Sequence, residues 1–169
     1  RFGKIGLVTV NVFWQRPQSY YDQDDWRGTL ELDGGALMNQ ASHYVDLLEW
    51  MIGPVESINA SIATIARDIE AEDTAAIKIK WKNGALGTMS VTMIAYPQNL
   101  EGSITILGEK GSVIVGGMTG EKLVEWSIKK NSNIKKLLNI NPKIKNGHIK
   151  FYQYVMNTLN NKSKNILNI

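Results

Sequence analysis

Residues 33–54 of the chain read D-G-G-A-L-M-N-Q-A-S-H-Y-V-D-L-L-E-W-M-I-G-P, a pattern typical of one amphipathic helix. Asp33 and the two glycines after it favour a helix start, and Gly53-Pro54 favours its end. The roughly sixteen residues between these signals are therefore predicted to form a single helix. Its apolar residues recur at helical spacing and predict a buried stripe. The stripe consists of Leu37, Ala41, Tyr44, Leu48 and Met51.

A second side of this helix differs from an ordinary solvated surface, which would more often carry lysine and glutamate. It carries Asn39, His43, Asp46 and Trp50. Their spacing of i, i+4, i+7 and i+11 places them on one face about 60° wide. An amide, an imidazole, a carboxylate and an indole on one face indicate a surface that could approach a ligand.

The order of residues in this helix resembles the substrate-domain helix of the Gfo/Idh/MocA oxidoreductases, the family of glucose-fructose oxidoreductase and inositol dehydrogenase. The shared pattern is G-G-A-L-x-N-x-x-x-H-x-x-D-L, starting at Gly34. In that family an Asp or Asn lies four residues before a catalytic His, and an Asp lies three residues after it. Asn39, His43 and Asp46 match those positions.

The resemblance implies hydride transfer from a sugar carbon to a nicotinamide, a reaction that also requires removal of the hydroxyl proton. His43 is then the candidate catalytic acid/base or proton relay, because an imidazole exchanges protons close to neutral pH. Asn39 is the candidate catalytic residue that orients a substrate hydroxyl, because a neutral amide cannot act as the base. Asp46 either fixes the tautomer of His43 or pairs with an arginine from a neighbouring segment. A purely structural histidine is the alternative for His43.

The segment just before this helix lacks periodicity, and Gln15–Gly28 is predicted to be a binding loop. Its sequence from Phe13 on, F-W-Q-R-P-Q-S-Y-Y-D-Q-D-D-W-R-G-T, resembles one branch of the family. That branch oxidises UDP-N-acetylglucosaminuronate at C3 for surface-polysaccharide synthesis, which includes lipopolysaccharide. Planar cations suit a carboxylate or a diphosphate, and flat aromatic faces suit a sugar or uracil ring. The candidate substrate-binding residues are Arg16, Tyr20, Tyr21, Trp26 and Arg27.

Two alternatives stay open for this loop. It could be an ordinary surface loop whose arginines pair with Asp22, Asp24 or Asp25. The substrate could also be a neutral sugar or a polyol such as inositol, although two arginines match the anionic groups of a UDP-N-acetylhexosaminuronate better.

One feature of the family is missing from the sequence. No strand–turn–helix segment carries the G-x-G-x-x-G fingerprint of dinucleotide binding, so no cofactor-binding residue is predicted. The resemblance implies that residues 1–169 are the single C-terminal, substrate-binding and oligomerisation domain of a two-domain dehydrogenase, without its N-terminal dinucleotide-binding domain. NAD(P) is then the cofactor of the full-length enzyme, and the chain alone is expected to be inactive and to bind none. A non-catalytic assembly module is the alternative.

Composition excludes several classes of protein. The 169 residues are 43% hydrophobic and 21% charged, which is typical of one globular domain. There are no cysteines, so disulfides and thiol catalysis are excluded; this absence is compatible with the cytoplasmic location that we expect but does not establish it. No apolar run approaches the roughly 18 residues of a membrane span. The histidines, His43 and His148, lie too far apart in sequence to suggest a metal site, and His148 is expected to be a helix cap or a surface residue.

The charge is uneven, because residues 126–169 contain nine lysines and no acidic residue. These lysines alternate with asparagines and lack arginine or an aromatic stacking pattern. A solvated surface is therefore predicted rather than a nucleic-acid partner.

The remaining periodicity predicts strands of small and β-branched residues separated by turn signals. They cover residues 5–14, 55–66, 74–81, 85–95, 101–107, 111–115 and 122–128, with a hairpin turn at Asn83-Gly84 and a late helix over 147–160. Strands in succession without helices between them indicate an α+β fold. We expect a predominantly antiparallel open sheet with helices on one face. The other face carries Ala76 and the aliphatic stems of Lys78 and Lys80, which predicts an oligomer interface of a homodimer or homotetramer.

Overall fold

The computed structural model describes residues 2–129 together with Tyr152, Met156 and Asn157. The chain divides into two compact units, Arg1–Ile134 and Lys135–Ile169. In the second unit Tyr152, Met156 and Asn157 are helical, while the rest of the predicted helix over 147–160, and His148, lie outside the described residues. No helix in the described part of the chain has the length and hydrophobicity that crossing a bilayer requires.

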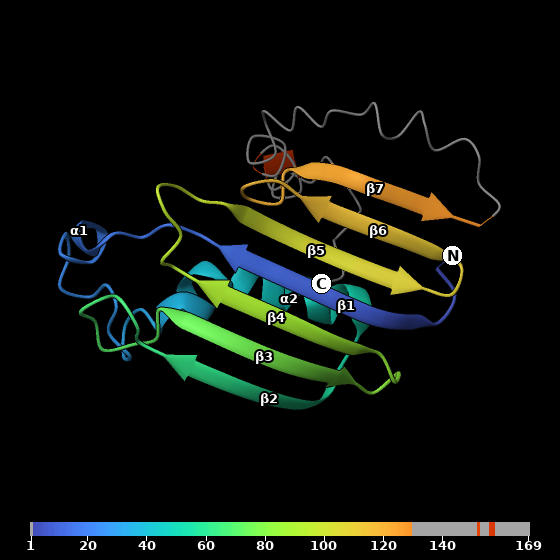
Figure 1. Ribbon diagram of the computed structural model, residues 1–169, viewed down its shortest axis with the longest axis horizontal. Coiled ribbons are helices and arrows are strands. Elements are labelled where there is room, and N and C mark those ends of the chain that lie inside the picture. The colour runs from blue at the N-terminus through green and yellow to red at the C-terminus, as the bar shows by residue number, and fades with distance from the viewer. Residues whose placement is uncertain (1, 130–151, 153–155, 158–169) are drawn as a thin grey trace. The chain divides into compact units, whose positions relative to one another are not determined.

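The described residues of the first unit form one seven-stranded sheet with the order β2-β3-β4-β1-β5-β6-β7 (Figure 1). Its strands are β1 (Ile5–Phe13), β2 (Val55–Ala63), β3 (Thr74–Trp81), β4 (Leu86–Thr92), β5 (Glu101–Gly108), β6 (Gly111–Gly116) and β7 (Lys122–Ile128). Every predicted strand is present, with ends that differ from the prediction by at most three residues. All neighbouring strands are antiparallel except β1 and β4, which are parallel. The predicted α+β fold with a predominantly antiparallel open sheet is confirmed.

The first strand in the chain, β1, lies at the centre of the sheet between β4 and β5. Val8, Val10 and Val12 on one of its faces are at most 1% exposed and belong to the main hydrophobic core. Because β1 and β4 run parallel, the segments that follow these two strands leave from the same end of the sheet. Gln15 and Ile94 consequently form an isolated bridge just beyond that end.

The predicted single helix is broken into two, so this prediction is wrong in detail. Ala36–Gln40 forms a short π-helix, η1, and Ser42–Ile52 forms the α-helix α2. The N–H of Ala41 donates to the carbonyl of Ala36, five residues earlier, at 3.0 Å. This wider turn changes the angle between residues before and after Ala41, and a wheel drawn at about 100° per residue does not hold across it.

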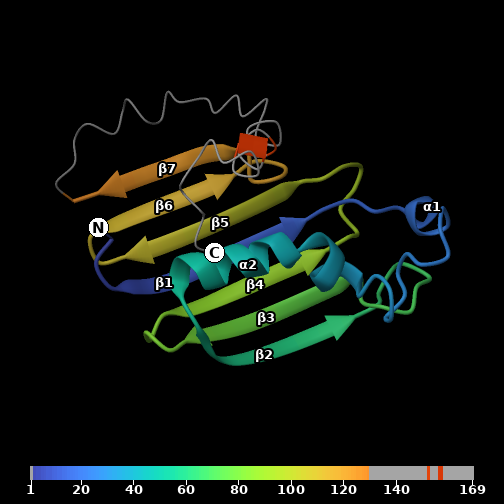
Figure 2. The ribbon, with the colours of Figure 1, turned by 180° about the vertical axis from the view of Figure 1, so that it is seen from behind.

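The helix α2 covers one face of the sheet (Figure 2). Tyr44, Leu48 and Ile52 are buried against it, and the first two belong to the predicted stripe. The predicted turn between β3 and β4 is present, with Gly84 at a φ of 86°. The Nδ2 of Asn83 in this turn donates to the carbonyl of Ile52 at 2.8 Å, so the hairpin holds the C-terminus of α2.

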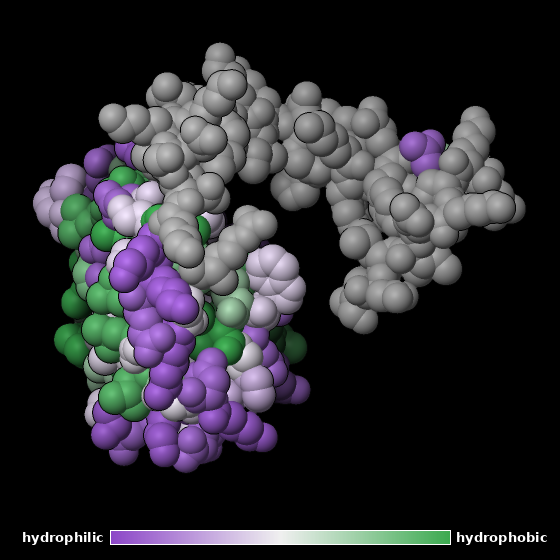
Figure 3. All heavy atoms as spheres, turned by 90° about the vertical axis from the view of Figure 1, so that its right-hand side faces the viewer, coloured by the Kyte–Doolittle hydropathy of each residue, from purple (hydrophilic) through white to green (hydrophobic). Residues whose placement is uncertain are grey.

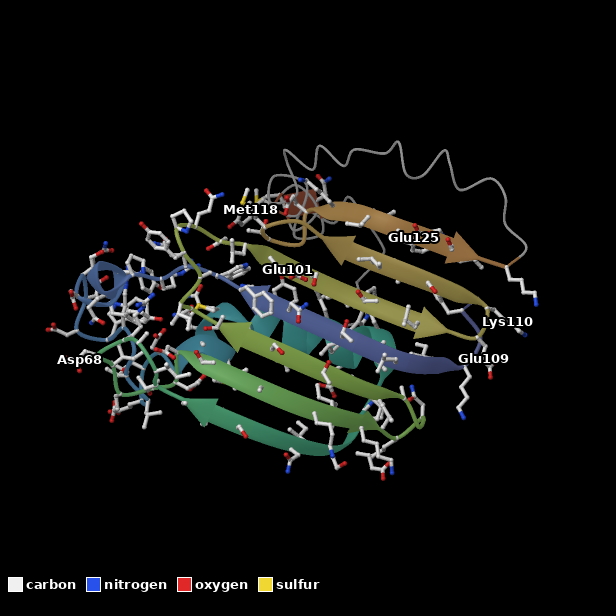
Figure 4. The ribbon with its side chains drawn as sticks, viewed as in Figure 1. Asp68, Glu101, Glu109, Lys110, Met118 and Glu125 are labelled. Atoms are coloured by element: carbon white, nitrogen blue, oxygen red, sulfur yellow. The ribbon has the colours of Figure 1, made fainter. Side chains whose placement is uncertain are left out.

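No described helix covers the opposite face of the sheet (Figure 1), as the sequence predicts. Leu86, Leu7 and Leu107 are paired neighbours across β4, β1 and β5 on this open face, and they are 53%, 41% and 38% exposed. Seen from one end, the described surface mixes hydrophobic and hydrophilic side chains (Figure 3). A cavity of about 450 Å³ near β5–β7 is lined by Glu101 and Met118 among others (Figure 4).

Candidate functional site

Three connections meet at the end of the sheet where β1 and β4 both finish. They are residues 14–28 after β1, residues 64–73 between β2 and β3, and residues 93–100 after β4. The side chain of Arg67 joins all three, because its Nε donates to the carbonyl of Arg16 at 2.6 Å and its Nη2 to the carbonyl of Met93 at 3.2 Å. Figure 4 shows the neighbouring Asp68 at this end of the sheet.

The predicted binding loop contains one helical turn, α1 (Gln18–Tyr21), which the sequence did not indicate. This turn places Tyr20 beside both arginines of the loop. The guanidinium carbon of Arg16 lies 5.4 Å from the centre of the Tyr20 ring, and that of Arg27 lies 4.3 Å from it. Cations at these distances are attracted by the ring, so the turn organises both arginines.

The charge of Arg16 has no ion-pair partner among the described carboxylates. Its guanidinium lies 5.5 Å from the centre of the Trp14 ring, its Nη2 donates to Oε1 of Gln40 at 2.6 Å, and its Nη1 donates to the carbonyl of Gln15 at 2.7 Å. These contacts fix the group without neutralising it. The positive charge is therefore available to an anionic ligand.

The charge of Arg27 is neutralised within the loop. Its Nη2 pairs with the carboxylate of Asp24 at 2.9 Å, and its Nη1 donates to Oε1 of Gln23 at 3.0 Å. The alternative prediction, a surface loop whose arginines pair with aspartates, agrees with the ion pair between Arg27 and Asp24. As a predicted substrate-binding residue, Arg27 is the weaker of the two candidates.

The aromatic residues predicted to bind substrate lie in different environments. Trp26 is 41% exposed and 5.4 Å from the guanidinium of Arg27. Tyr21 is only 6% exposed, and burial, with the nearby Tyr20, raises the pKa of its hydroxyl to about 12. Its ring fills the interior of the loop. In this structure Tyr21 therefore has little exposed ring surface on which a sugar or uracil could stack, and its role in substrate binding stays a prediction.

A chain of amides links the loop to η1. Gln40 is 9% exposed, and its Nε2 donates to the hydroxyl of Tyr20 at 3.3 Å and to Oδ1 of Asn39 at 3.0 Å. The Nδ2 of Asn39 in turn donates to the carboxylate of Asp33, which also accepts from the N–H of Gly28 at 2.7 Å. Asn39, a predicted catalytic residue, thus lies in the same network as Arg16. Sequence reasoning missed Gln40 because it treated this position as an unremarkable part of the helix.

The other residues of the predicted polar face lie on α2. His43 and Asp46 are exposed, and in the described part of the chain neither the bond between them nor a bond from Asp46 to an arginine is present. Trp50 is 80% exposed and lines an apolar cavity of about 520 Å³ with Leu47 and Met51. The described structure therefore exposes His43 to solvent and does not join it to Asp46.

A carboxylate of the chain itself lies against Gly35, the second of the paired glycines before η1. Gly35 has a φ of 72°, and a Cβ on it would lie 2.5 Å from a carboxylate oxygen of Glu72. The N–H of Leu37 donates to this carboxylate at 2.8 Å, and the N–H of Ala36 donates to the carbonyl of Glu72 at 2.9 Å. Asp33 is not the helix cap that the sequence predicted, since its oxygens accept elsewhere. Gly35 thus makes room for Glu72, while a Cβ on Gly34 would meet the side chain of Met38.

A buried carboxylate shapes the connection over residues 64–73. Asp73 is fully buried, with Oδ2 accepting from the N–H groups of Ala66 and Arg67 at 2.8 and 3.0 Å. Its Oδ1 accepts from the N–H of Ile65 at 3.0 Å and the hydroxyl of Thr74 at 2.9 Å. Burial acts to raise the pKa of Asp73, but these donors outweigh it and hold the pKa below its ordinary 3.8. The sequence indicated only a polar turn here.

The described residues contain no group of three or more His, Cys, Asp or Glu side chains that could hold a metal ion. What this end of the sheet offers is a guanidinium without a described carboxylate partner, an amide network and exposed aromatic surface, while the exposed imidazole of His43 lies on α2. Such groups can bind an anionic, ring-containing ligand and exchange a proton with it.

Comparison with known proteins places this chain among oxidoreductases. It is 54% identical to the WlbA dehydrogenase of Chromobacterium violaceum, solved with NADH and UDP-GlcNAcA, over 96% of this chain and 47% of that one, with a TM-score of 0.88. It is 52% identical to the WlbA dehydrogenase of Bordetella pertussis, solved with the same two ligands, over 97% of this chain and 49% of that one, with a TM-score of 0.89. The chain thus spans about half the length of these relatives.

Two further comparisons agree with these. An uncharacterized oxidoreductase of Synechocystis is 34% identical in an alignment 104 residues long that covers 54% of this chain and 28% of that protein. Levoglucosan dehydrogenase, at 21% identity and a TM-score of 0.67 over 78% of this chain and 38% of that one, shares the fold.

A family model for the GFO/IDH/MocA C-terminal domain matches residues 1–114, which is more than half of the chain. The chain therefore belongs to the GFO/IDH/MocA family of oxidoreductases, in which it corresponds to the C-terminal domain.

Proposed function

We propose that residues 1–169 are the substrate-binding domain of an NAD(P)-dependent dehydrogenase that oxidises a UDP-N-acetylhexosaminuronate at C3. The observation that carries this proposal is the Arg16 guanidinium, which is fixed by Gln40 and aromatic rings and has no described carboxylate partner. A uronate or a diphosphate supplies the missing negative charge, whereas inositol and glucose do not. The likeness to two dehydrogenases solved with UDP-GlcNAcA supports the same substrate class.

In this proposal His43 removes or relays the proton of the reacting hydroxyl. It is exposed at the start of α2 and forms no hydrogen bond with a described residue, so its ring nitrogens are free for that task. Asn39 orients a hydroxyl with the N–H and the lone pair that remain after its bonds to Asp33 and Gln40. The cofactor, bound by a domain outside this chain, accepts the hydride.

We assign the cofactor to another domain because the sequence of this chain carries no G-x-G-x-x-G fingerprint and Gly35 packs against Glu72. We expect the 169-residue chain alone to bind no nicotinamide dinucleotide and to show no turnover. Tight binding of NADH to this chain, measured by fluorescence or calorimetry, would contradict that assignment.

The test of the substrate class is a panel of compounds offered to the complete dehydrogenase, with reduction of NAD and NADP followed at 340 nm. Preference for UDP-N-acetylglucosaminuronate is expected. Preference for inositol or free glucose, with no effect of replacing Arg16, would reject the nucleotide-sugar assignment and leave the dehydrogenase family intact. Absence of turnover with every compound would favour the assembly module.

We also propose that the open face of the sheet joins copies of the chain into a homodimer or homotetramer. Leu86, Leu7 and Leu107 form an apolar row across three strands, and rows of this kind are usually covered by a partner. Replacing Leu7 with glutamate should lower the molar mass measured by light scattering. An unchanged mass, or a monomeric wild type, would remove this part of the proposal.

A cytoplasmic location and a place in lipopolysaccharide or other surface-polysaccharide biosynthesis belong to the same proposal. Both follow from the substrate class that the family branch implies. Loss of the surface polysaccharide on deletion of the gene, with recovery on complementation, is the expected result.

A further inference from the structure

The two arginines of the loop hold their charges in different ways. Each donates to the side-chain oxygen of a glutamine, Arg16 to Gln40 at 2.6 Å and Arg27 to Gln23 at 3.0 Å. Only Arg27 also pairs with a carboxylate, that of Asp24 at 2.9 Å. Both pairs consist of an arginine and a glutamine, but the Arg27–Gln23 pair is neutralised by Asp24, whereas the Arg16–Gln40 pair keeps a net positive charge.

The orientation of Gln40 is set by three partners. Its Oε1 accepts from Arg16, while its Nε2 donates to the hydroxyl of Tyr20 and to Oδ1 of Asn39. The side chain is 9% exposed, so it cannot turn freely in solvent. A neutral amide in this place fixes the guanidinium, whereas a carboxylate would form a close ion pair and cancel its charge.

The carboxylate in this network lies at its far end. Asp33 accepts from Asn39 and from the N–H of Gly28, and two amides stand between it and Arg16. The arrangement separates the negative charge from the guanidinium. The end of the network at Arg16 therefore keeps a positive charge.

We propose that Gln40 is a positioning residue that sets the charge selectivity of the substrate site. By holding Arg16 with an uncharged amide, it keeps the guanidinium free to bind an anionic group of the substrate, either a carboxylate or a phosphate. This inference rests on the proposed function, because it names the residue pair that recognises the anion in that site. It assigns the task to Arg16 and Gln40 and not to Arg27.

The test is Gln40→Glu in the complete dehydrogenase. The substitution keeps the size of the side chain and an oxygen that accepts from Arg16, adds the missing negative charge, and removes the N–H group that donates to Tyr20 and Asn39. The Kd for UDP-N-acetylglucosaminuronate should rise about tenfold or more, which corresponds to about 1.4 kcal/mol, while kcat at saturation stays within about threefold. Gln23→Glu is the matched control, because it places the same charge beside Arg27, and it should change the Kd by less than about twofold.

A second variant separates charge from shape. Gln40→Met removes the hydrogen bonds without adding a charge, so its Kd should rise less than that of Gln40→Glu. An equal or larger loss in Gln40→Met would show that the missing hydrogen bonds, and not the added charge, weaken binding, and would overturn the proposed role in charge selectivity. Melting temperatures of all variants report whether each one folds.

UDP-N-acetylglucosamine, which has the diphosphate but no uronate carboxylate, identifies the anion. A loss confined to the uronate assigns Arg16 to the carboxylate, and an equal loss for both ligands assigns it to the diphosphate; either result supports the proposal. If wild type binds the uronate and Gln40→Glu binds both ligands as wild type does, the proposal is wrong. If wild type itself does not bind the uronate, the proposed function has failed instead.

Discussion

The substitution Asp73→Asn should destabilise the chain by about 2–6 kcal/mol, because each buried N–H left without an acceptor costs about 1–3 kcal/mol. The wild-type carboxylate accepts four hydrogen bonds, two on each oxygen. The asparagine oxygen can keep only one pair of donors, and its NH₂ group then faces the other pair. If the oxygen keeps Ile65 and Thr74, the N–H groups of Ala66 and Arg67 lose their acceptor.

The loss should also depend on pH. The folded structure holds the pKa of Asp73 below its ordinary 3.8, so the carboxylate contributes stability that is present above the unfolded-state pKa and lost as the pH falls through the lower folded-state pKa. Asparagine does not titrate. The difference in unfolding free energy between wild type and Asp73→Asn should therefore be constant from about pH 5 to pH 8 and shrink below about pH 4.

The measurement is urea unfolding followed by tryptophan fluorescence, at several pH values, with both proteins at equal concentration. Asp68→Asn is the matched control, since Asp68 is exposed and its carboxylate accepts no hydrogen bond from a described residue. It should change stability by less than about 0.5 kcal/mol. An Asp73→Asn variant as stable as this control at pH 7, or a difference that does not shrink in acid, would refute the role of Asp73.

Three further outcomes are expected. His43→Ala should lower turnover of the complete enzyme by about 10²–10⁴-fold, with an unchanged melting temperature because the residue is exposed; near-normal turnover would make it structural. Arg16→Ala should weaken binding of the anionic substrate by about 1.5–3 kcal/mol, Arg16→Lys should restore only part of it, and equal affinities by calorimetry would contradict this. Gly35→Ala should destabilise the chain more than Gly53→Ala, because both glycines have positive φ but only the first added Cβ meets Glu72; equal urea midpoints would argue against that contact.

Much of the fold follows from local sequence patterns. The strands β3 and β7 have the predicted bounds, and the turn at Asn83-Gly84 forms as predicted. Each of these features depends on residues close together in the chain, whose side-chain period and backbone preferences act without distant partners. The apolar stripe through Tyr44 and Leu48 is predictable for the same reason. The sequence of the loop likewise made Arg16 a candidate for binding an anionic ligand, and this stays a prediction.

Only the tertiary structure decided which of these groups act together. Arg16 meets Gln40 across 24 positions of sequence, and Arg67 meets the carbonyl of Arg16 across 51. Both contacts exist because β1 lies between β4 and β5. Burial of the β1 valines stabilises this central position, and no local sequence pattern encodes it. The first N–H groups of η1, those of Ala36 and Leu37, donate to Glu72, a residue from another connection. Arg27 is neutralised by Asp24, only three residues away, whereas the long-range partner Gln40 holds Arg16 without adding a charge, and so the tertiary structure decides how the free guanidinium is placed.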